Sequence, residues 1–309
     1  MISFESPSLP YLFFALGIYI LTIFCLVHAW RQGCQGRWLF WVILAASFYG
    51  YIAEYMSVTS KEHPYWYGEF IVKLPGPVPL AVFLGWGIII YASILTSHWL
   101  GFPRLLQPFL CGFLAVSVDY VMDPVAVYLG FWTWNPYMWD LETQWFGIPW
   151  SNFVGWFVVV VTFSLTHRVC HRWVPPGERG FWGDFLVAFL AIIPSFLIFM
   201  GFMLLYTWVV ELNLISEELL FFIFFGLCFI PVFLYIPQFK RDHKIDYVIF
   251  AVPVFFYSLC LILYFATGFH SKEHEFIIVL PALALLSFIA FLWPYLDTLA
   301  PTSTKEFQK

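Results

Sequence analysis

The sequence predicts an all-α integral membrane protein: a polytopic transmembrane helix bundle of about nine spans, with the N-terminus outside and the C-terminus cytoplasmic. Three observations predict this class. Hydrophobic residues make up 62% of the 309 residues and charged residues only 11%, with a mean hydropathy of +0.83, far from the balance of a water-soluble domain. Charges divide the chain into apolar runs of roughly 18 to 22 residues, each able to cross about 30 Å of hydrocarbon as a helix. Lastly, the basic residues gather in alternate loops.

The first apolar run follows "MISFESPSLP", which lacks the basic region of a cleavable signal, so we expect this run to remain as a span. Each later run begins and ends near charged residues or prolines. No repeat, low-complexity tract or soluble linker interrupts the series, which favours one membrane domain over residues 1–309. The predicted spans are 10–29, 38–58, 77–97, 105–123, 150–167, 185–208, 218–239, 245–267 and 276–296.

The distribution of Lys and Arg predicts the orientation. Loops on the side of the N-terminus hold only Lys61, Lys73 and Lys272, whereas the other loops hold the remaining basic residues of the total of 14. Because basic loops stay in the cytoplasm, the N-terminus is expected outside. Most acidic residues near the membrane fall on that same non-cytoplasmic side, which is where we expect any chemistry.

Several functional classes find no support. The chain has no Gly-rich phosphate loop, GxSxG elbow, HExxH or CxxCH sequence, so hydrolase, ATPase and c-type haem interpretations are not favoured. The expected partner is the lipid bilayer, with no nucleic acid. Six cysteines are scattered mostly inside spans without paired spacing, and we expect buried thiols: Cys25, Cys34, Cys111, Cys170, Cys228 and Cys260.

Two aspartates in "VSVDYVMDPVAVYLGFWTWN" are the leading candidate site. Asp119 and Asp123 lie one helical turn apart, and Pro124 is expected to end the helix directly after them. Two carboxylates in a low-dielectric setting cannot both ionise cheaply, so one tends to keep its proton and can serve as a general acid. Glu54, near the end of another span on the same side, would add a third carboxyl. The alternative is a solvated helix end near the interface.

Two other interpretations stay open. A DxxxD pair can bind Mg²⁺ and a diphosphate, as in prenyltransferases, but such enzymes also need a second acidic helix and basic residues nearby. In "HRVCH", His167 and His171 have metal-ligand spacing, but adjacent arginines favour a basic helix end that faces lipid headgroups. We therefore expect no metal and no cofactor.

The chain is rich in aromatic residues, with 38 Phe, 17 Tyr and 16 Trp. Such a bundle suits a long, flat, apolar ligand, and aromatic faces can stabilise a carbocation. Lipid-facing helices and interfacial belts of Trp and Tyr would give a similar composition.

The segment from Asp119 to Trp156 resembles a known family. The residues that carry the resemblance are "DYVMDPVAVYLGFWTWN" and "WFGIPWSNFVGWF", together with Glu54 and "PVPLAVFLGWGIIIY" upstream. They are similar to membrane-bound carotenoid-biosynthesis proteins, whose characterised members are CruF-type carotenoid 1′,2′-hydratases and bisanhydrobacterioruberin hydratase. The resemblance spans roughly residues 50–160 and implies a multi-pass protein of a bacterial or archaeal cytoplasmic membrane.

The resemblance implies hydration of the terminal C1=C2 double bond of a linear or monocyclic carotenoid, with Asp119, Asp123 and Glu54 as the acid/base set. Other carotenoid-pathway enzymes are implied as partners. From its position beside Pro124, Asp123 is expected to be the hydrated, ionised member, and Asp119 the one that holds the proton. The residues implied to bind substrate are Trp86, Tyr91, Trp132, Trp134, Asn152 and Trp156.

The chain departs from the family pattern after Glu54. Family members usually carry a Gly-Thr-Gly-Phe-Pro-Phe-Gly-x-Tyr-like loop, whereas this sequence reads "SVTSKEHPYWYGEF". That loop would border the site and bear on substrate identity. Two alternatives to a hydratase therefore stand: a carotenoid- or lipid-binding membrane subunit without catalysis, and another isoprenoid-end enzyme such as a prenyltransferase-like protein.

Overall fold

The computed structural model describes residues 8–173, 179–271 and 276–299. Within these ranges, nine helical stretches are long and apolar enough to cross a membrane. The predicted all-α, multi-pass class is thus confirmed, and each predicted span coincides with one of the stretches. They are Leu9–Arg31, Arg37–Thr59, Leu80–Trp99, Gln107–Tyr128, Trp150–Trp173, Gly180–Glu211, Glu217–Gln238, Tyr247–Ala266 and Ile278–Leu299.

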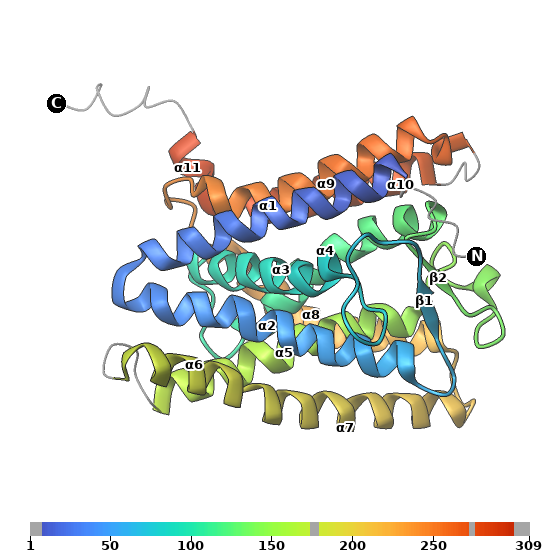
Figure 1. Cartoon of the computed structure of the whole chain (residues 1–309), viewed down its shortest axis with the longest axis horizontal. Helices are drawn as coiled ribbons and strands as arrows, with labels where there is room; N and C mark the ends of the chain where they lie inside the picture. The colour runs from blue at the N-terminus through green and yellow to red at the C-terminus, as the bar shows by residue number, and fades with distance from the viewer. Residues whose placement is uncertain (1–7, 174–178, 272–275, 300–309) are drawn as a thin grey trace.

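Helices α3 (Leu80–Trp99) and α4 (Gln107–Tyr128) form the centre of the bundle. In Figure 1 they lie between α1 (Leu9–Arg31), α9 (Tyr247–Ala266) and α10 (Phe276–Leu292) on one side and α2 (Gly33–Thr59), α5 (Trp150–Trp173) and α7 (Ile192–Glu211) on the other. Their apolar windows are 72% and 78% buried, against 17% for α8 (Glu217–Tyr235). The outer helices therefore present their apolar side chains to lipid, and the polar groups that need partners collect on α3, α4 and their neighbours.

Shorter elements complete the chain. The sixth span consists of α6 (Gly180–Leu190) followed directly by α7, with a single residue between them. Within the described ranges, four 3₁₀ turns and a short helix, α11, lie in the loops or at the ends of the longer helices: η1 Leu141–Thr143, η2 Ile236–Gln238, η3 Phe269–Ser271, η4 Trp293–Tyr295 and α11 Leu296–Leu299.

Two loops at one end of the bundle are joined by a small antiparallel sheet. Strand β1 (Tyr65–Tyr67), between α2 and α3, pairs with β2 (Trp132–Trp134), between α4 and α5. The ladder is extended by Asn135 N–H to the Pro64 carbonyl at 2.8 Å and by Gly68 N–H to the Phe131 carbonyl at 2.9 Å. We call this end of the molecule the loop end. The opposite end, where α11 lies (Figure 1), carries Arg104, Arg168 and Lys240, and we call it the basic end.

The prediction that Pro124 ends its helix is wrong: Pro124 lies inside α4, which continues to Tyr128. A proline removes one backbone donor, but a transmembrane helix tolerates it where neighbouring groups compensate. The helix is terminated by Gly130, which lies two residues beyond Tyr128 and has a φ of 74°. The Gly130 and Phe131 amides then bond the Val127 and Ala126 carbonyls at 3.0 and 2.8 Å, the pattern of a glycine-terminated helix.

The cysteines follow the expectation only in part. All five whose side chains are described are free thiols; Cys25, Cys111 and Cys260 are buried, whereas Cys170 and Cys228 are half-buried. The side chain of Cys34 lies outside the described part of the structure.

Candidate active site

Three buried carboxyl groups from two helices lie at the loop end. Glu54 belongs to the last turns of α2, and Asp119 and Asp123 lie one turn apart on α4. Their exposed fractions are 8%, 0% and 2%. The alternative of a solvated helix end is therefore wrong for the aspartates, because α4 extends beyond them and its neighbours exclude solvent.

One amide connects the two aspartates. Asn152, in the first turn of α5, donates through Nδ2 to Asp119 Oδ2 at 2.9 Å and to Asp123 Oδ2 at 2.7 Å. The pair is thus held by a neutral group that donates to both carboxyls. The other oxygen of Asp119, Oδ1, is buried and has no hydrogen-bond partner within the described residues.

Glu54 has a different environment, made of three donors. Trp86 donates its indole N–H to Oε1 at 3.0 Å, and Tyr67 donates its hydroxyl to Oε2 at 2.5 Å. Tyr65 also donates to Oε2. Burial, reinforced by the nearby carboxyl, raises the pKa of the Tyr65 and Tyr67 phenols well above the ordinary 10.0. Both phenols therefore remain protonated donors at neutral pH.

The alternation of a strand explains how two tyrosines reach one carboxyl. In "YWY", the first and third side chains point to the same face, while the middle one points away. Trp66 is accordingly 49% exposed, whereas Tyr65 and Tyr67 both bond Glu54. The pairing with β2 fixes this register, since Tyr65 lies opposite Trp134 and Tyr67 opposite Trp132.

A cavity of about 50 Å³ lies between the two carboxyl environments. Its polar wall includes Glu54, Asp123 and Asn152, and Asp119 meets it only through Asn152. The rest of the wall is largely apolar and comes from α1, α3, α4, α9 and β2. It includes Phe14, Ile18, Val82, Gly85, Ile89, Met122, Trp132, Trp134 and Phe256.

Two stacked tryptophans form one side of this cavity. The Trp86 and Trp156 rings lie 4.0 Å apart between centroids, at 28° to one another, and both residues line the cavity. The indole N–H of Trp86 points to Glu54, so the same side chain orients a carboxyl and supplies an aromatic surface.

Most of the site residues expected from the sequence meet at this cavity: Glu54, Trp86, Asp123, Trp132, Trp134, Asn152 and Trp156 line it, and Asp119 contacts Asn152. Tyr91 does not reach it. Tyr91 lies five residues after Trp86 on α3, which corresponds to a rise of about 7.5 Å and a rotation of about 140°. Its side chain therefore faces away from the cavity. It is fully buried, and its hydroxyl hydrogen-bonds with His28 Nδ1 at 2.9 Å.

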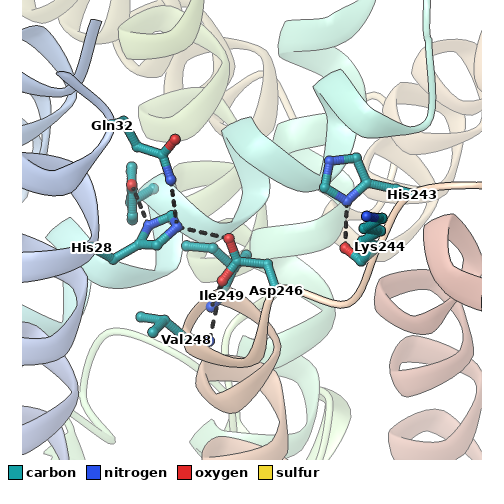
Figure 2. A network of polar contacts seen from close by, with 8 residues as sticks. His28, Gln32, His243, Lys244, Asp246, Val248 and Ile249 are labelled. Atoms are coloured by element: carbon teal, nitrogen blue, oxygen red, sulfur yellow. Dashed lines mark hydrogen bonds and ion pairs between the residues drawn. The ribbon is translucent and has the colours of Figure 1, made fainter. Parts of the chain in front are cut away.

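His28 belongs to a separate polar network near the basic end. Its Nε2 lies 2.7 Å from Asp246 Oδ2 and 2.9 Å from Gln32 Nε2, and Asp246 also caps α9 by accepting from the Val248 and Ile249 amides (Figure 2). Tyr91 thus takes part in a contact between α1, α3 and α9 and is not a wall of the candidate active site.

The sequence reasoning missed several wall residues. Tyr65 and Tyr67 lie in the loop that departs from the family pattern, and the alternating "YWY" was a signal for a strand with two tyrosines on one face. Phe14, Ile18 and Phe256 gave no signal, because an apolar residue in a span that faces a cavity has the same identity as one that faces lipid.

Nothing in the described part of the chain groups three or more His, Cys, Asp or Glu side chains as metal ligands. His167 and His171, the one sequence pair with such spacing, lie on α5 at the basic end, away from the carboxyls. His167 is 5% exposed and stacks on Trp38, with ring centroids 4.5 Å apart. The His167 ring therefore faces the bundle interior, whereas Arg172 at the same helix end is exposed.

Comparison with known proteins decides the family. The profile of the carotenoid biosynthesis protein family matches residues 11–223. The chain belongs to this family. The match begins in α1 and ends in α8, so it extends well beyond the 50–160 segment that carries recognisable motifs. Searches of curated proteins and of solved structures found no match. As a carotenoid biosynthesis protein, the chain brings its buried carboxyls and its aromatic cavity together on spans within the matched region, with the one addition of Phe256 from α9.

Proposed function

We propose that this carotenoid biosynthesis protein hydrates the terminal C1=C2 double bond of a linear or monocyclic carotenoid, giving a tertiary alcohol. The observation that carries the proposal is the pair of unlike acid environments on one apolar cavity. Asp123 shares a single amide with Asp119, whereas Glu54 accepts from two phenols and an indole. Hydration of an unactivated alkene needs such a set: a neutral acid to protonate carbon and a base to take a proton from water.

This proposal exchanges the roles expected from the sequence, because Asp123 is buried rather than hydrated. The geometry favours Asp123 as the acid that meets the substrate, because it lines the cavity and Asp119 does not. Asp119 has a buried oxygen without a donor, and an ionised carboxylate would leave that oxygen uncompensated at high cost. We therefore assign Asp119 as a permanently neutral neighbour. Because Asp119 is uncharged, it does not repel Asp123 when Asp123 becomes a carboxylate by giving up its proton.

The reaction then runs in two steps. The proton of Asp123 adds to C2 of the isoprenoid end, the double-bond electrons form the new C–H bond, and C1 becomes a tertiary cation. The aromatic wall, with Trp86, Trp132 and Trp134, stabilises this charge through its π faces.

Water then bonds to C1 through oxygen and loses one proton to Glu54, whose three donors stabilise its negative charge against the cost of burial. The proton returns from Glu54 to Asp123 before the next turnover. The net change is the addition of one water, with no oxidant or reductant.

The size of the cavity fits the water rather than the whole substrate end. A water molecule occupies roughly 30 Å³ of liquid volume, so the present 50 Å³ holds one or two waters. Binding of an isoprenoid end therefore requires side chains of the apolar wall to move outward, while the polar wall stays fixed by its hydrogen bonds.

The test is to express the chain in a host that accumulates lycopene or γ-carotene and to analyse the pigments by mass spectrometry. The expected result is a product heavier by about 18 Da, the mass of water. Asp123→Asn and Glu54→Gln should each lower product formation by at least the roughly 10²-fold typical of losing a general acid or base. Glu211→Gln, on an exposed residue at the end of α7, is the matched control and should leave it unchanged.

Three results would argue against the proposal. An unchanged pigment mass in cells with verified membrane expression would remove the hydratase activity. Copurification of a coloured polyene of unchanged mass would favour the non-catalytic binding subunit. Full activity of Asp123→Asn with loss in Asp119→Asn would reverse the two assigned roles.

A further inference from the structure

A second and larger cavity lies at the basic end of the bundle. It has a volume of about 1370 Å³ and is enclosed by the ends of α3, α4 and α5, the start of α2 and the segment that precedes α9. Four permanent cations line it: Arg104, Arg168, Arg172 and Lys240. Asp242 is the only carboxylate among its lining residues. The cavity is therefore strongly electropositive.

The cations of this cavity are not neutralised by the protein itself. None of the four takes part in a salt bridge among the described residues. By contrast, Arg179, close by on the same end but outside the cavity, pairs with the buried Asp184 at 3.4 Å. Arginines that lie near one another without carboxylates repel, and an anion bound between them would relieve this repulsion.

Two buried nitrogen donors point to the same conclusion. His167 lines the cavity, is 5% exposed and has no hydrogen-bond partner at Nδ1 or Nε2. Arg168 Nε is likewise buried and unpartnered. Buried polar atoms are normally hydrogen-bonded, so such a cluster at a cavity wall indicates a ligand that supplies the acceptors.

The wall of the cavity is fixed in place. Lys240 N–H donates to the Leu100 carbonyl at 3.0 Å, and the His243 ring stacks on Trp99 with centroids 4.3 Å apart. His243 Nδ1 also contacts the Lys244 carbonyl (Figure 2). Two residues after Lys244, Asp246 pairs with His28 of α1. These contacts hold the segment that carries Lys240 and His243 against α1 and α3, so the cations are preorganised.

We propose that this cavity is a binding site for a phosphate-bearing anion. Guanidinium groups recognise phosphate oxygens through paired N–H donors, and a phosphate offers enough acceptors for several cations at once. The same chemistry is presented by the headgroup of an anionic phospholipid and by free diphosphate. The cavity lies at the membrane end opposite to Asp123, so this proposal does not depend on the hydratase reaction.

The experiment uses the full chain purified into nanodiscs. In the first arm the discs contain only phosphatidylcholine, and binding of radiolabelled pyrophosphate is measured at low salt. In the second arm the discs contain phosphatidylcholine and phosphatidylglycerol in equal amounts, and native mass spectrometry counts the retained phosphatidylglycerol. The variant is Arg168→Gln. Arg31→Gln, at the same membrane end but outside the cavity, is the matched control.

We expect Arg168→Gln to weaken binding in one arm by about 10-fold or more, the usual loss for one charge-assisted hydrogen bond, while Arg31→Gln stays within a factor of two or so. Loss in the first arm identifies free phosphate as the ligand source, and loss in the second identifies a headgroup. Because Arg168 is partly buried, the exposed pair Arg104→Gln and Lys240→Gln provides a second variant that spares the core. Absence of binding in both arms, or binding that none of the cavity variants weakens, would overturn the proposal.

Discussion

Replacement of Asn152 by leucine tests the candidate active site at the residue that links the two aspartates. Leucine has nearly the same size as asparagine but cannot donate, so the change removes the contacts of 2.9 and 2.7 Å to Asp119 and Asp123 together. It leaves the Glu54 cluster untouched. Any loss of activity then belongs to the aspartate pair.

The size of the effect follows from these contacts. A hydrogen bond to a group that is charged in one state of the reaction contributes about 1.5–3 kcal/mol. In the proposed reaction Asp123 becomes ionised once its proton has moved to carbon, so its contact with Asn152 would strengthen as the transition state forms. Since about 1.4 kcal/mol corresponds to a factor of ten in rate, Asn152→Leu should lower turnover roughly 10- to 100-fold.

The assay is the ratio of hydrated to unmodified carotenoid per amount of membrane-inserted protein. Gln238→Leu, an exposed amide in η2 at the basic end, serves as the control and should match wild type. If Asn152→Leu inserts normally and its turnover stays within about threefold of wild type, the amide does not assist the aspartates and the reasoning about this pair fails.

Three further predictions concern other parts of the structure. Tyr65→Phe with Tyr67→Phe removes two donors from Glu54 and should lower turnover about 10-fold or more. Because the pKa of both phenols lies well above 10.0, neither phenol should contribute a titration to the wild-type pH–rate profile between about pH 6 and 9. Gly130→Ala should lower the free energy of unfolding by about 1 kcal/mol, measured by thermal melting, because φ is 74° while the space for a methyl group is open. An unchanged melting temperature would show that this turn relaxes without strain. Asp246→Ala should destabilise the protein by about 0.5–2 kcal/mol through loss of the cap on α9, and Asp246→Asn by less, because asparagine keeps the contacts to the Val248 and Ile249 amides; equal losses would assign the effect to the His28 contact.

Span positions were predictable because the membrane imposes them. A run of apolar residues bounded by charges has one stable solution in hydrocarbon, which is a helix, and all nine predicted runs coincide with helical stretches. Helix ends were harder to predict. Pro124 is a breaker in water, but α4 passes through it to Tyr128 and is terminated by Gly130, whose left-handed conformation no hydrophobic pattern indicates.

The carboxyl groups of the site were also visible in the sequence, because an ionisable residue in a span is rare and expensive. Their division into two environments was not visible. It depends on Asn152, which is 29 residues from Asp123. It also depends on Tyr65 and Tyr67, because the register of their strand is set by pairing with Trp132–Trp134, 67 residues further along the chain. Long-range pairings of this kind leave no local periodicity, and the same holds for the aromatic residues that line the cavity from α1 and α9.

The β1–β2 pairing determines the direction from which a substrate reaches the carboxyls. These strands cover the cavity from the side of the aqueous phase, and opening them would break backbone hydrogen bonds such as those made by Gly68 and Asn135. The wall formed by α1 and α9 consists of apolar side chains at the same level, with the Phe14 and Phe256 rings 6.4 Å apart. Rotation of such side chains is far easier than separation of a sheet. Under the proposed function, a polyene dissolved in the bilayer would therefore reach Asp123 from the lipid between α1 and α9, without leaving the hydrocarbon.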